Sequence, residues 1–357
     1  MSEKLNLSTS AYCKIEYGKP ITVKPGDSYY VTYSVTVKPE ALAAMKANNV
    51  DVKNRYYVYA SNAKSDSGDA IDQVWHGAVV TSAGNEGQAR HHYSGQVSQN
   101  ASKVEVKVGE SEYGFTMELW GLAPNRYYVD IESPSGQKTG RIQGGLSGQR
   151  DVTFLLERTR LIVEYFTVDS SAGAPVIVMR FQNPAPGIWN IYVSDDEVGN
   201  REFDLWLPIT NFLSEDTFFL ESTPYNTLVA PSNTGLLMCC GSYNSNTGSL
   251  AIDSSRGFPR NAVKPDFTAP GVEILGPLPR NRYGRKSGTS VSGAITAGIA
   301  ALMLEWGIVQ RNDMQMNTTR IKNYLIRGAR RDQGRIYPNR EWGYGEIDLY
   351  ETFLGIR

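Results

Sequence analysis

The sequence predicts an α/β fold that is interrupted by an inserted all-β sandwich. Residues 78–82, AVVTS, form a short apolar run of the kind that becomes a buried parallel strand. Residues 287–306 form a long apolar stretch without proline, which is typical of a core helix. Between these two segments, short strand-like runs with alternating faces recur at regular spacing. We therefore expect an α/β body at 54–97 and 226–357, with the sandwich at 98–225.

Composition narrows the class of protein. The chain has 357 residues, 41% hydrophobic residues and a net charge of −1, which argues against nucleic acid or an anionic membrane as the main partner. Cys13, Cys239 and Cys240 cannot all pair, and the adjacent two are expected to be buried thiols. No signal peptide is recognisable, and the apolar run Ala294–Trp306 is too short to span a membrane. We expect a cytoplasmic-type soluble protein without metal or cofactor.

The first part of the chain is rich in strand signals. Residues 20–38 read as a hairpin, Pro39–Asn49 as a short helix, and Arg55–Ala60 as a strand. A second short helix is expected over Ala70–His76, before the strand at 78–82. The role of residues 1–53 stays open.

The predicted sandwich contains seven strands separated by turns rich in Gly, Pro and Asn. Trp189 follows a Pro-Gly turn and is expected in the core of the sandwich. The strands are expected at Lys103–Val108, Tyr113–Trp120, Tyr127–Glu132, Val152–Leu156, Leu161–Thr167, Val176–Phe181 and Trp189–Val193.

A sequence pattern typical of an α/β fold returns after residue 226. Gly235–Cys240 is an apolar strand, and Lys264–Val272 is extended because its prolines exclude a helix. Ser287–Trp306 is expected as a largely buried helix, and Asn317–Gly328 as an amphipathic helix that ends at a glycine. Trp342–Phe353 closes the chain with a Gly-rich turn and a short helix.

The head of the helix at 287–306 carries small and hydroxyl residues, Gly288-Thr289-Ser290. A serine at this position lies where free backbone N–H groups and the helix dipole stabilise a developing negative charge. Acyl transfer needs such an environment around its nucleophile. The alternative is structural, since Thr289 or Ser290 could simply cap a core helix.

Four segments in order carry a family resemblance: SAGNEG at 82–87, SSRG at 254–257, KPDFTAPGV at 264–272 and GTS at 288–290. Together they resemble the subtilisin-like serine proteases, and the closing segment WGYGEID at 342–348 is similar to the end of such domains. More narrowly, RHHYSG at 90–95 followed by a jelly-roll-like sandwich resembles the clostridial Csp germination proteases. The resemblance implies an incomplete subtilisin-like parallel sheet, and a cytoplasmic or spore-associated location.

The resemblance also assigns roles to residues in the α/β body. Ser290 matches the nucleophile of an endopeptidase that forms an acyl-enzyme, and Asn85 matches the asparagine of the oxyanion hole. Ala83, Gly84, Gly288 and Thr289 would line the substrate cleft.

A nucleophilic serine needs a histidine as base and a carboxylate that orients it. The family carries them in a D-T/S-G segment and an H-G-T helix, and neither is recognisable here. Asp66-Ser67-Gly68 matches the D-S-G motif but is expected in a polar loop. His76 is expected at the surface of a helix end, and His91 and His92 on the loop that enters the sandwich. No triad Asp or His is therefore identified.

Three functions follow from these observations. The chain is expected to be a subtilase homologue that is inactive as it stands, because residues 1–53 do not resemble the segment that bears Asp and His. Alternatively, a separate or upstream segment completes an active endopeptidase, or the chain is a non-catalytic binding or regulatory pseudoprotease. The expected partner is a polypeptide substrate or a protein, with a possible companion chain at the sheet edge left open by the missing strands.

Overall fold

The computed structural model describes residues 63–64, 70–71, 77–98, 101–142, 149–166, 174–196, 200–258 and 263–356. The predicted hairpin 20–38, the helix Pro39–Asn49 and the strand Arg55–Ala60 lie outside these residues. Two short strands, β1 (Ala63–Lys64) and β2 (Ala70–Ile71), pair antiparallel. The start of the helix expected from Ala70 is thus wrong, because these two residues belong to a strand ladder.

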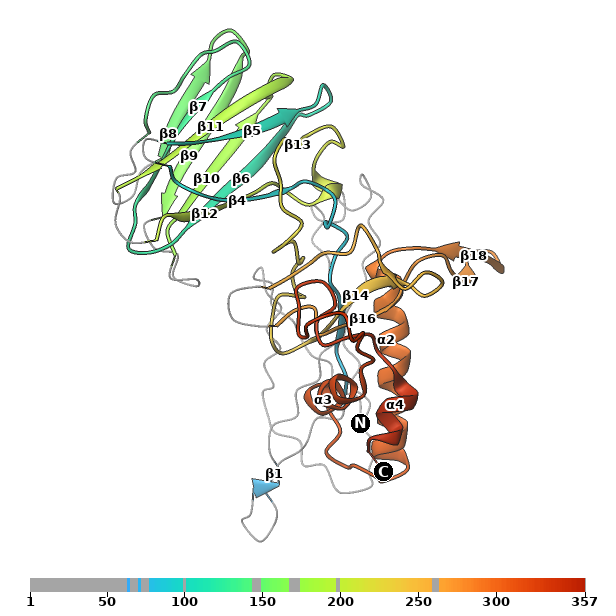
Figure 1. Cartoon of the computed structure of the whole chain (residues 1–357). Coiled ribbons are helices and arrows are strands. Elements are labelled where there is room, and N and C mark those ends of the chain that lie inside the picture. Colours follow the sequence, from blue (N-terminus) through green and yellow to red (C-terminus); the bar gives the residue numbers. More distant parts are fainter. Residues whose placement is uncertain are drawn as a thin grey trace, which may run out of the picture. The chain divides into compact units, whose positions relative to one another are not determined.

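Two antiparallel sheets occupy the middle of the described chain (Figure 1). One has six strands in the order β4-β12-β6-β10-β9-β8, and the other has four in the order β13-β5-β11-β7. All seven predicted strands are present. The sheets are built from β4 (His92–Gln96), β5 (Ser102–Val108), β6 (Gly114–Gly121), β7 (Tyr127–Glu132), β8 (Gln149–Phe154), β9 (Thr159–Phe166), β10 (Val176–Gln182), β11 (Gly187–Asp195), β12 (Glu202–Trp206) and β13 (Phe218–Phe219).

The strands of these sheets pair in a nested order. β4 pairs with β12, β5 with β11 and β6 with β10, all antiparallel. Successive strands β4, β5, β6 and β7 alternate between the two sheets. The first strand of this arrangement, β4, begins at His92, on the N-terminal side of the expected boundary at residue 98.

The alternation of buried and half-buried residues along these strands explains why the two sheets pack against each other. β6 alternates strictly, with Met117 and Leu119 fully buried. The inner side chains of both sheets form one hydrophobic cluster. Trp189 lies in this cluster as predicted, at 1% exposure, edge-on to Phe154 and Phe181.

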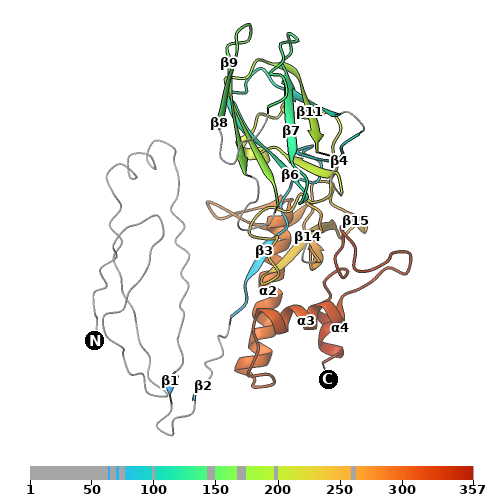
Figure 2. The same ribbon diagram turned by 90° about the vertical axis from the view of Figure 1, so that its left-hand side faces the viewer.

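A smaller sheet forms the α/β part. β3 (Val80–Ser82) and β16 (Phe267–Pro270) pair in parallel with β14 (Met238–Asn244), and β15 (Ser249–Leu250) pairs antiparallel with β14 (Figure 2). The strand expected at Gly235–Cys240 therefore begins three residues later and extends further. β3 pairs with β14 on one side, and no other strand of the described chain pairs with its second edge.

Helix α2 (Thr289–Leu304) packs against β3, β14 and β16. Its buried residues are Thr289, Ser292, Thr296, Ala300 and Met303. The expectation of a largely buried helix is wrong, because Ala297, Ala301 and Leu302 are exposed. With the π-helical turn η2 (Glu305–Val309), the segment Thr289–Val309 is, by length and composition alone, one candidate membrane span among the described residues. Its contacts with three strands make it a core helix of this fold.

The remaining described elements follow β12 or flank α2 in the sequence. A short 3-10 turn η1 (Thr210–Phe212) follows β12, and β17 (Ile274–Leu278) and β18 (Arg282–Lys286) form a hairpin before α2. Helix α3 (Thr318–Gly328) ends at the predicted glycine, and α4 (Leu349–Leu354) packs against it. Buried apolar side chains from the sheet, α2 and α3 form a second hydrophobic cluster.

Candidate functional site

Ser290 is exposed in the first turn of α2. The helix is preceded by Gly288 at φ 127°, a conformation that residues with a side chain rarely adopt. The N-cap of α2 is Gly288, so the alternative of Thr289 or Ser290 as a simple capping residue is wrong. Neither the hydroxyl nor the backbone N–H of Ser290 has a hydrogen-bond partner among the described residues.

Asn85 is held directly against this helix end. Its Oδ1 accepts hydrogen bonds from the Thr289 backbone N–H and from the Thr289 hydroxyl, both at 3.0 Å. The Thr289 hydroxyl accepts in turn from the Gly84 N–H at 3.1 Å. Because its oxygen is fixed in this way, the Asn85 amide Nδ2 is left as a donor without a partner in the described chain. Two free donors, this amide and the Ser290 N–H, thus accompany the serine.

The loop that carries Asn85 is braced by the SSRG segment. Ser255 Oγ accepts the Glu86 N–H at 2.9 Å, and its N–H donates to the Gly84 carbonyl at 2.9 Å. Gly84 is at φ 108°, and a Cβ there would come within 2.5 Å of the Val229 side chain. Ser254 also has a structural role, because its Oγ accepts a hydrogen bond from the Ser242 N–H of β14. Both serines of the SSRG segment, Ser254 and Ser255, thus hold backbone in place.

The KPDF segment is fixed by a buried ion pair. Lys264 Nζ, at 1% exposure, donates to Asp266 Oδ2 at 2.6 Å and to the Leu237 carbonyl at 2.6 Å. Asp266 Oδ2 also accepts the Cys239 N–H at 2.7 Å. Burial raises the pKa of Asp266 above its usual value, although Lys264 and these hydrogen bonds oppose the shift. The pair joins β14 to β16 at the base of the sheet.

Both cysteines of β14 are buried free thiols, as predicted. Burial raises the pKa of Cys240 to about 12 and that of Cys239 further. A thiol that remains protonated at neutral pH is a poor nucleophile. Cys13 lies outside the described residues.

Glu86, next to Asn85, forms a buried cluster that sequence reasoning missed. Its carboxylate accepts from the Thr210 N–H at 3.1 Å and the Thr210 hydroxyl at 2.9 Å, and it lies 2.9 Å from His91 Nδ1. Burial disfavours its charge, but the hydrogen bonds from His91 and Thr210 outweigh burial and lower the pKa of Glu86. Thr210 is 124 residues away in sequence, so no local signal could have revealed this contact.

His92 is likewise engaged away from the serine. It is 1% exposed in β4, its Nδ1 lies 2.5 Å from the Tyr225 carbonyl, and its Nε2 lies 3.0 Å from Asp204 Oδ1. Its ring stacks on Trp206 at 4.5 Å between centroids. His91 lies on the loop that enters the antiparallel sheets, as predicted, whereas the prediction is wrong for His92, which is the first residue of β4. Both side chains are buried. His76 and Asp66-Ser67-Gly68 lie outside the described residues.

The residues expected to line a substrate cleft differ in exposure. Ala83, Gly288 and Thr289 are buried, and Gly84 is half-buried beside the exposed Asn85. Their role in a cleft stays a prediction.

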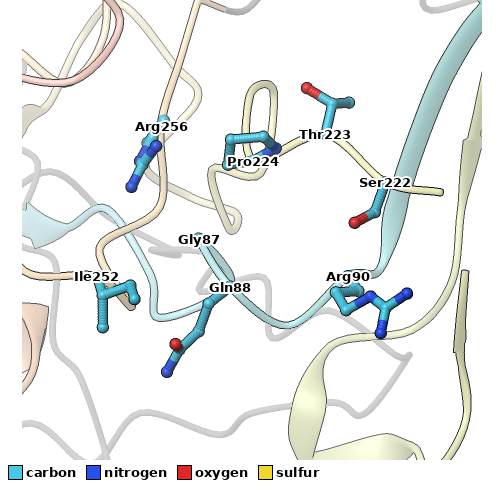
Figure 3. Close-up of a pocket in the computed structure, with 8 residues that line it drawn as sticks. All are labelled: Gly87, Gln88, Arg90, Ser222, Thr223, Pro224, Ile252 and Arg256. Atoms are coloured by element: carbon cyan, nitrogen blue, oxygen red, sulfur yellow. The ribbon is translucent and has the colours of Figure 1, made fainter. Parts of the chain in front are cut away.

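A separate pocket of about 250 Å³ follows the Asn85 loop (Figure 3). Figure 3 shows that the side chains of Gln88 and Arg90 extend away from each other, so these polar groups do not converge on one ligand position. The pocket is lined by Gly87, Gln88, Arg90, Ser222, Thr223, Pro224, Ile252 and Arg256.

An exposed serine thus lies at a helix start, beside the amide of an asparagine that follows a parallel strand. Comparison with known proteins identifies the family. A profile of the Subtilase family matches residues 198–345. The chain is a homologue of the subtilase family of serine peptidases.

Individual relatives extend this result. The CspB protease of Clostridium perfringens superposes with a TM-score of 0.73 at 31% identity, covering 78% of this chain and 59% of that one. The subtilisin-like protease SBT6.1 of Arabidopsis thaliana is 31% identical over 137 residues, 36% of this chain and 13% of the relative. The C5a peptidase of Streptococcus pyogenes is 33% identical over 92 residues, 24% of this chain and 8% of the relative. The chain thus spans only part of each of these proteins.

Proposed function

We propose that the chain is a subtilase homologue that binds polypeptide at the Ser290–Asn85 site and is inactive as an endopeptidase in this form. The proposal rests on the contrast between Ser290, which lies beside unpaired N–H donors, and the two neighbouring histidines, which are engaged elsewhere. Ser290 and two free N–H donors are in place, whereas His91 and His92 are both buried in other contacts. Without a base, a serine hydrolase retains only the contribution of its oxyanion hole and binding, on the order of 10³–10⁴ over water in studied triads.

In this proposal, Ser290 occupies the nucleophile position, and its N–H and the Asn85 amide form the oxyanion hole. The support is geometric, because the bonds from Thr289 fix the orientation of Asn85 before any ligand arrives. Preorganised donors are the main source of electrostatic stabilisation in acyl transfer. The same donors would hold a carbonyl oxygen of a bound polypeptide.

A fluorophosphonate probe tests this proposal, because it labels only serines that are activated as nucleophiles. We expect the purified chain to label no faster than its Ser290→Ala variant. A Ser290→Ala/Asn85→Ala variant controls for labelling elsewhere. Rapid labelling that disappears in Ser290→Ala would overturn the inactive form and show that the chain supplies its own base.

A second candidate is an endopeptidase completed by a separate polypeptide that brings Asp and His. Its support is the second edge of β3, which no described strand pairs, next to an apolar groove of about 390 Å³. A strand edge beside an apolar groove is a common site for strand addition. The groove is lined by Ala78, Val79, Val80, Ala297, Ala300, Ala301 and Leu304.

This candidate predicts that labelling of Ser290 becomes fast when a polypeptide with the missing D-T/S-G and H-G-T motifs is added. Ala301→Glu places a charge in the groove from an exposed position, so the variant should fold normally but lose the acceleration. Leu302→Glu, on the same helix and exposed but outside the groove, is the matched control. Equal acceleration in both variants would rule out the groove as the docking site.

We also propose that the jelly-roll-like insertion, predicted at 98–225, begins with β4 at residue 92 and interrupts a body formed by the residues from 54 up to β4 and by 226–357. The nested pairing of β4 with β12, β5 with β11 and β6 with β10 supports this, since a jelly roll is a folded-over set of such antiparallel pairs. Residues 1–53 would be a further segment, and by resemblance the protein would be cytoplasmic or spore-associated. Limited proteolysis that cuts first just before β4 and near residue 225 would support these boundaries.

A further inference from the structure

The hairpin β17–β18 carries an unusual concentration of positive charge. Residues 274–286, ILGPLPRNRYGRK, contain four cationic side chains and no acidic one, in a chain of net charge −1. All four are exposed. Within the described chain none of them forms an ion pair, although Arg285 donates a hydrogen bond to the Glu273 carbonyl at 2.6 Å. The four cations are Arg280, Arg282, Arg285 and Lys286.

The base of this hairpin is tied to the Ser290 site. The Gly288 N–H donates to the Gly271 carbonyl at 2.8 Å, and the Glu273 N–H donates to Ser287 Oγ at 2.9 Å. Only three residues separate Lys286, the end of β18, from Ser290. A five-residue strand spans about 17 Å, which is the length of about five residues of an extended peptide. The hairpin can therefore lie along a polypeptide whose backbone reaches Ser290.

The register of the hairpin divides its cations and its exposed apolar side chains between two faces. Leu275 pairs with Arg285 and Pro277 with Tyr283, so these four share one face. Leu275 is 61% exposed and Tyr283 is 73% exposed. Arg282 and Lys286 occupy the other face. The face that carries Arg282 and Lys286 is therefore cationic and complementary to acidic residues of a polypeptide, while the opposite face offers the apolar side chains and Arg285.

We infer that the β17–β18 hairpin recognises an acidic stretch of the polypeptide that binds at Ser290. This inference rests on the proposed polypeptide-binding function and names the class of ligand. Nucleic acid is less favoured because the patch adjoins a peptide-type site and because the chain as a whole is not basic. Exposed charge pairs are individually weak, so recognition would depend on several of them acting together and would be sensitive to salt.

Fluorescence anisotropy of labelled peptides tests the inference in the full chain carrying Ser290→Ala, which prevents any cleavage. One peptide contains three acidic residues, and its twin has Gln or Asn at the same positions. We expect the acidic peptide to bind about tenfold more tightly than its twin, and this advantage to vanish in Arg282→Glu/Lys286→Glu. The control Arg126→Glu/Arg150→Glu changes the net charge equally at exposed positions in the antiparallel sheets, and should keep the advantage.

Each other outcome overturns the inference in a recognisable way. Equal binding of both peptides would refute the role of the hairpin while leaving the polypeptide-binding proposal intact. Binding of neither peptide would refute both, and fluorophosphonate labelling would still report separately on Ser290. Equal loss in the control variant would reduce the effect to net charge. Tighter, hairpin-dependent binding of a single-stranded oligonucleotide of equal charge would assign the surface to nucleic acid instead.

Discussion

The hydroxyl of Thr289 is the point at which the orientation of Asn85 can be tested without altering the serine. Thr289 is 0% exposed, and its hydroxyl donates to Asn85 Oδ1 and accepts from the Gly84 N–H. The substitution Thr289→Val keeps the shape of the side chain and removes only these two bonds. Thr and Val have similar helix propensities, so α2 itself should be little affected.

The expected loss can be worked from these contacts. A neutral hydrogen bond contributes about 1 kcal/mol, and leaving the half-buried Gly84 N–H unpaired costs about 1–3 kcal/mol. Together these effects predict that Thr289→Val lowers the free energy of unfolding by about 2–4 kcal/mol. Thr289→Ser retains the hydroxyl and loses one methyl group, which costs about 1 kcal/mol.

Urea denaturation followed by tryptophan fluorescence measures both variants, with an unchanged m-value as the check that the unfolding transition is the same. Combining Thr289→Val with Asn85→Ala should show a coupling of about 0.5–1.5 kcal/mol, because the two side chains are in direct contact. A Thr289→Val loss below about 0.5 kcal/mol, or additive effects of the two changes, would refute the idea that Thr289 holds Asn85 in place.

Three further predictions concern the residues that support this site. Lys264→Met removes the nearer of two cations beside the buried Asp266 and leaves only Lys322, whose Nζ lies 3.8 Å from Asp266 Oδ1. The free energy of unfolding in urea should fall by about 3 kcal/mol, the lower end of the range for a broken buried pair, and a loss below ~1 kcal/mol would contradict the ion pair. Because the pKa of Glu86 is lowered in the folded protein, its carboxylate stabilises the fold above the ordinary carboxyl pKa, and this contribution is lost as pH falls through the pKa of the folded state. Glu86→Gln should therefore make the free energy of unfolding less dependent on pH across that acidic range. An unchanged pH profile would count against this role of Glu86. Gly84→Ala, with φ 108° and a clash at 2.5 Å, should cost about 2–4 kcal/mol, against about 1 kcal/mol for the uncrowded control Gly248→Ala at φ 70°; equal thermal stabilities of the two variants would show that crowding is not the cause.

The strands that sequence predicted best are those whose alternation reflects burial on one face. All seven expected strands of the antiparallel sheets exist because their inward residues, such as Met117 and Leu119, are apolar at every second position. The strands that were missed have weaker local signals. β4 contains a glycine and polar residues, and its buried His92 depends on stacking with Trp206 across the sheet.

Helix α2 is an element whose existence the sequence predicts but whose burial it does not. Its apolar composition predicts a helix correctly, but apolar composition does not say which faces are covered. Ala297 and Ala301 are exposed because β3 is the last described strand on that side of the sheet. The sequence motifs likewise predict the contact between Asn85 and the head of α2, whereas the contact between Glu86 and Thr210 depends on how the chain folds back over 124 residues.

The positions of Asn85 and Glu86 decide what the neighbouring histidines can do. Asn85 is exposed, while its neighbour Glu86 is buried. Asn85 bonds to the head of α2, whereas the Glu86 carboxylate bonds to Thr210 and lies 2.9 Å from His91 Nδ1. We therefore interpret the Glu86–His91 pair as a support for the loop that orients Asn85, and not as a displaced catalytic pair.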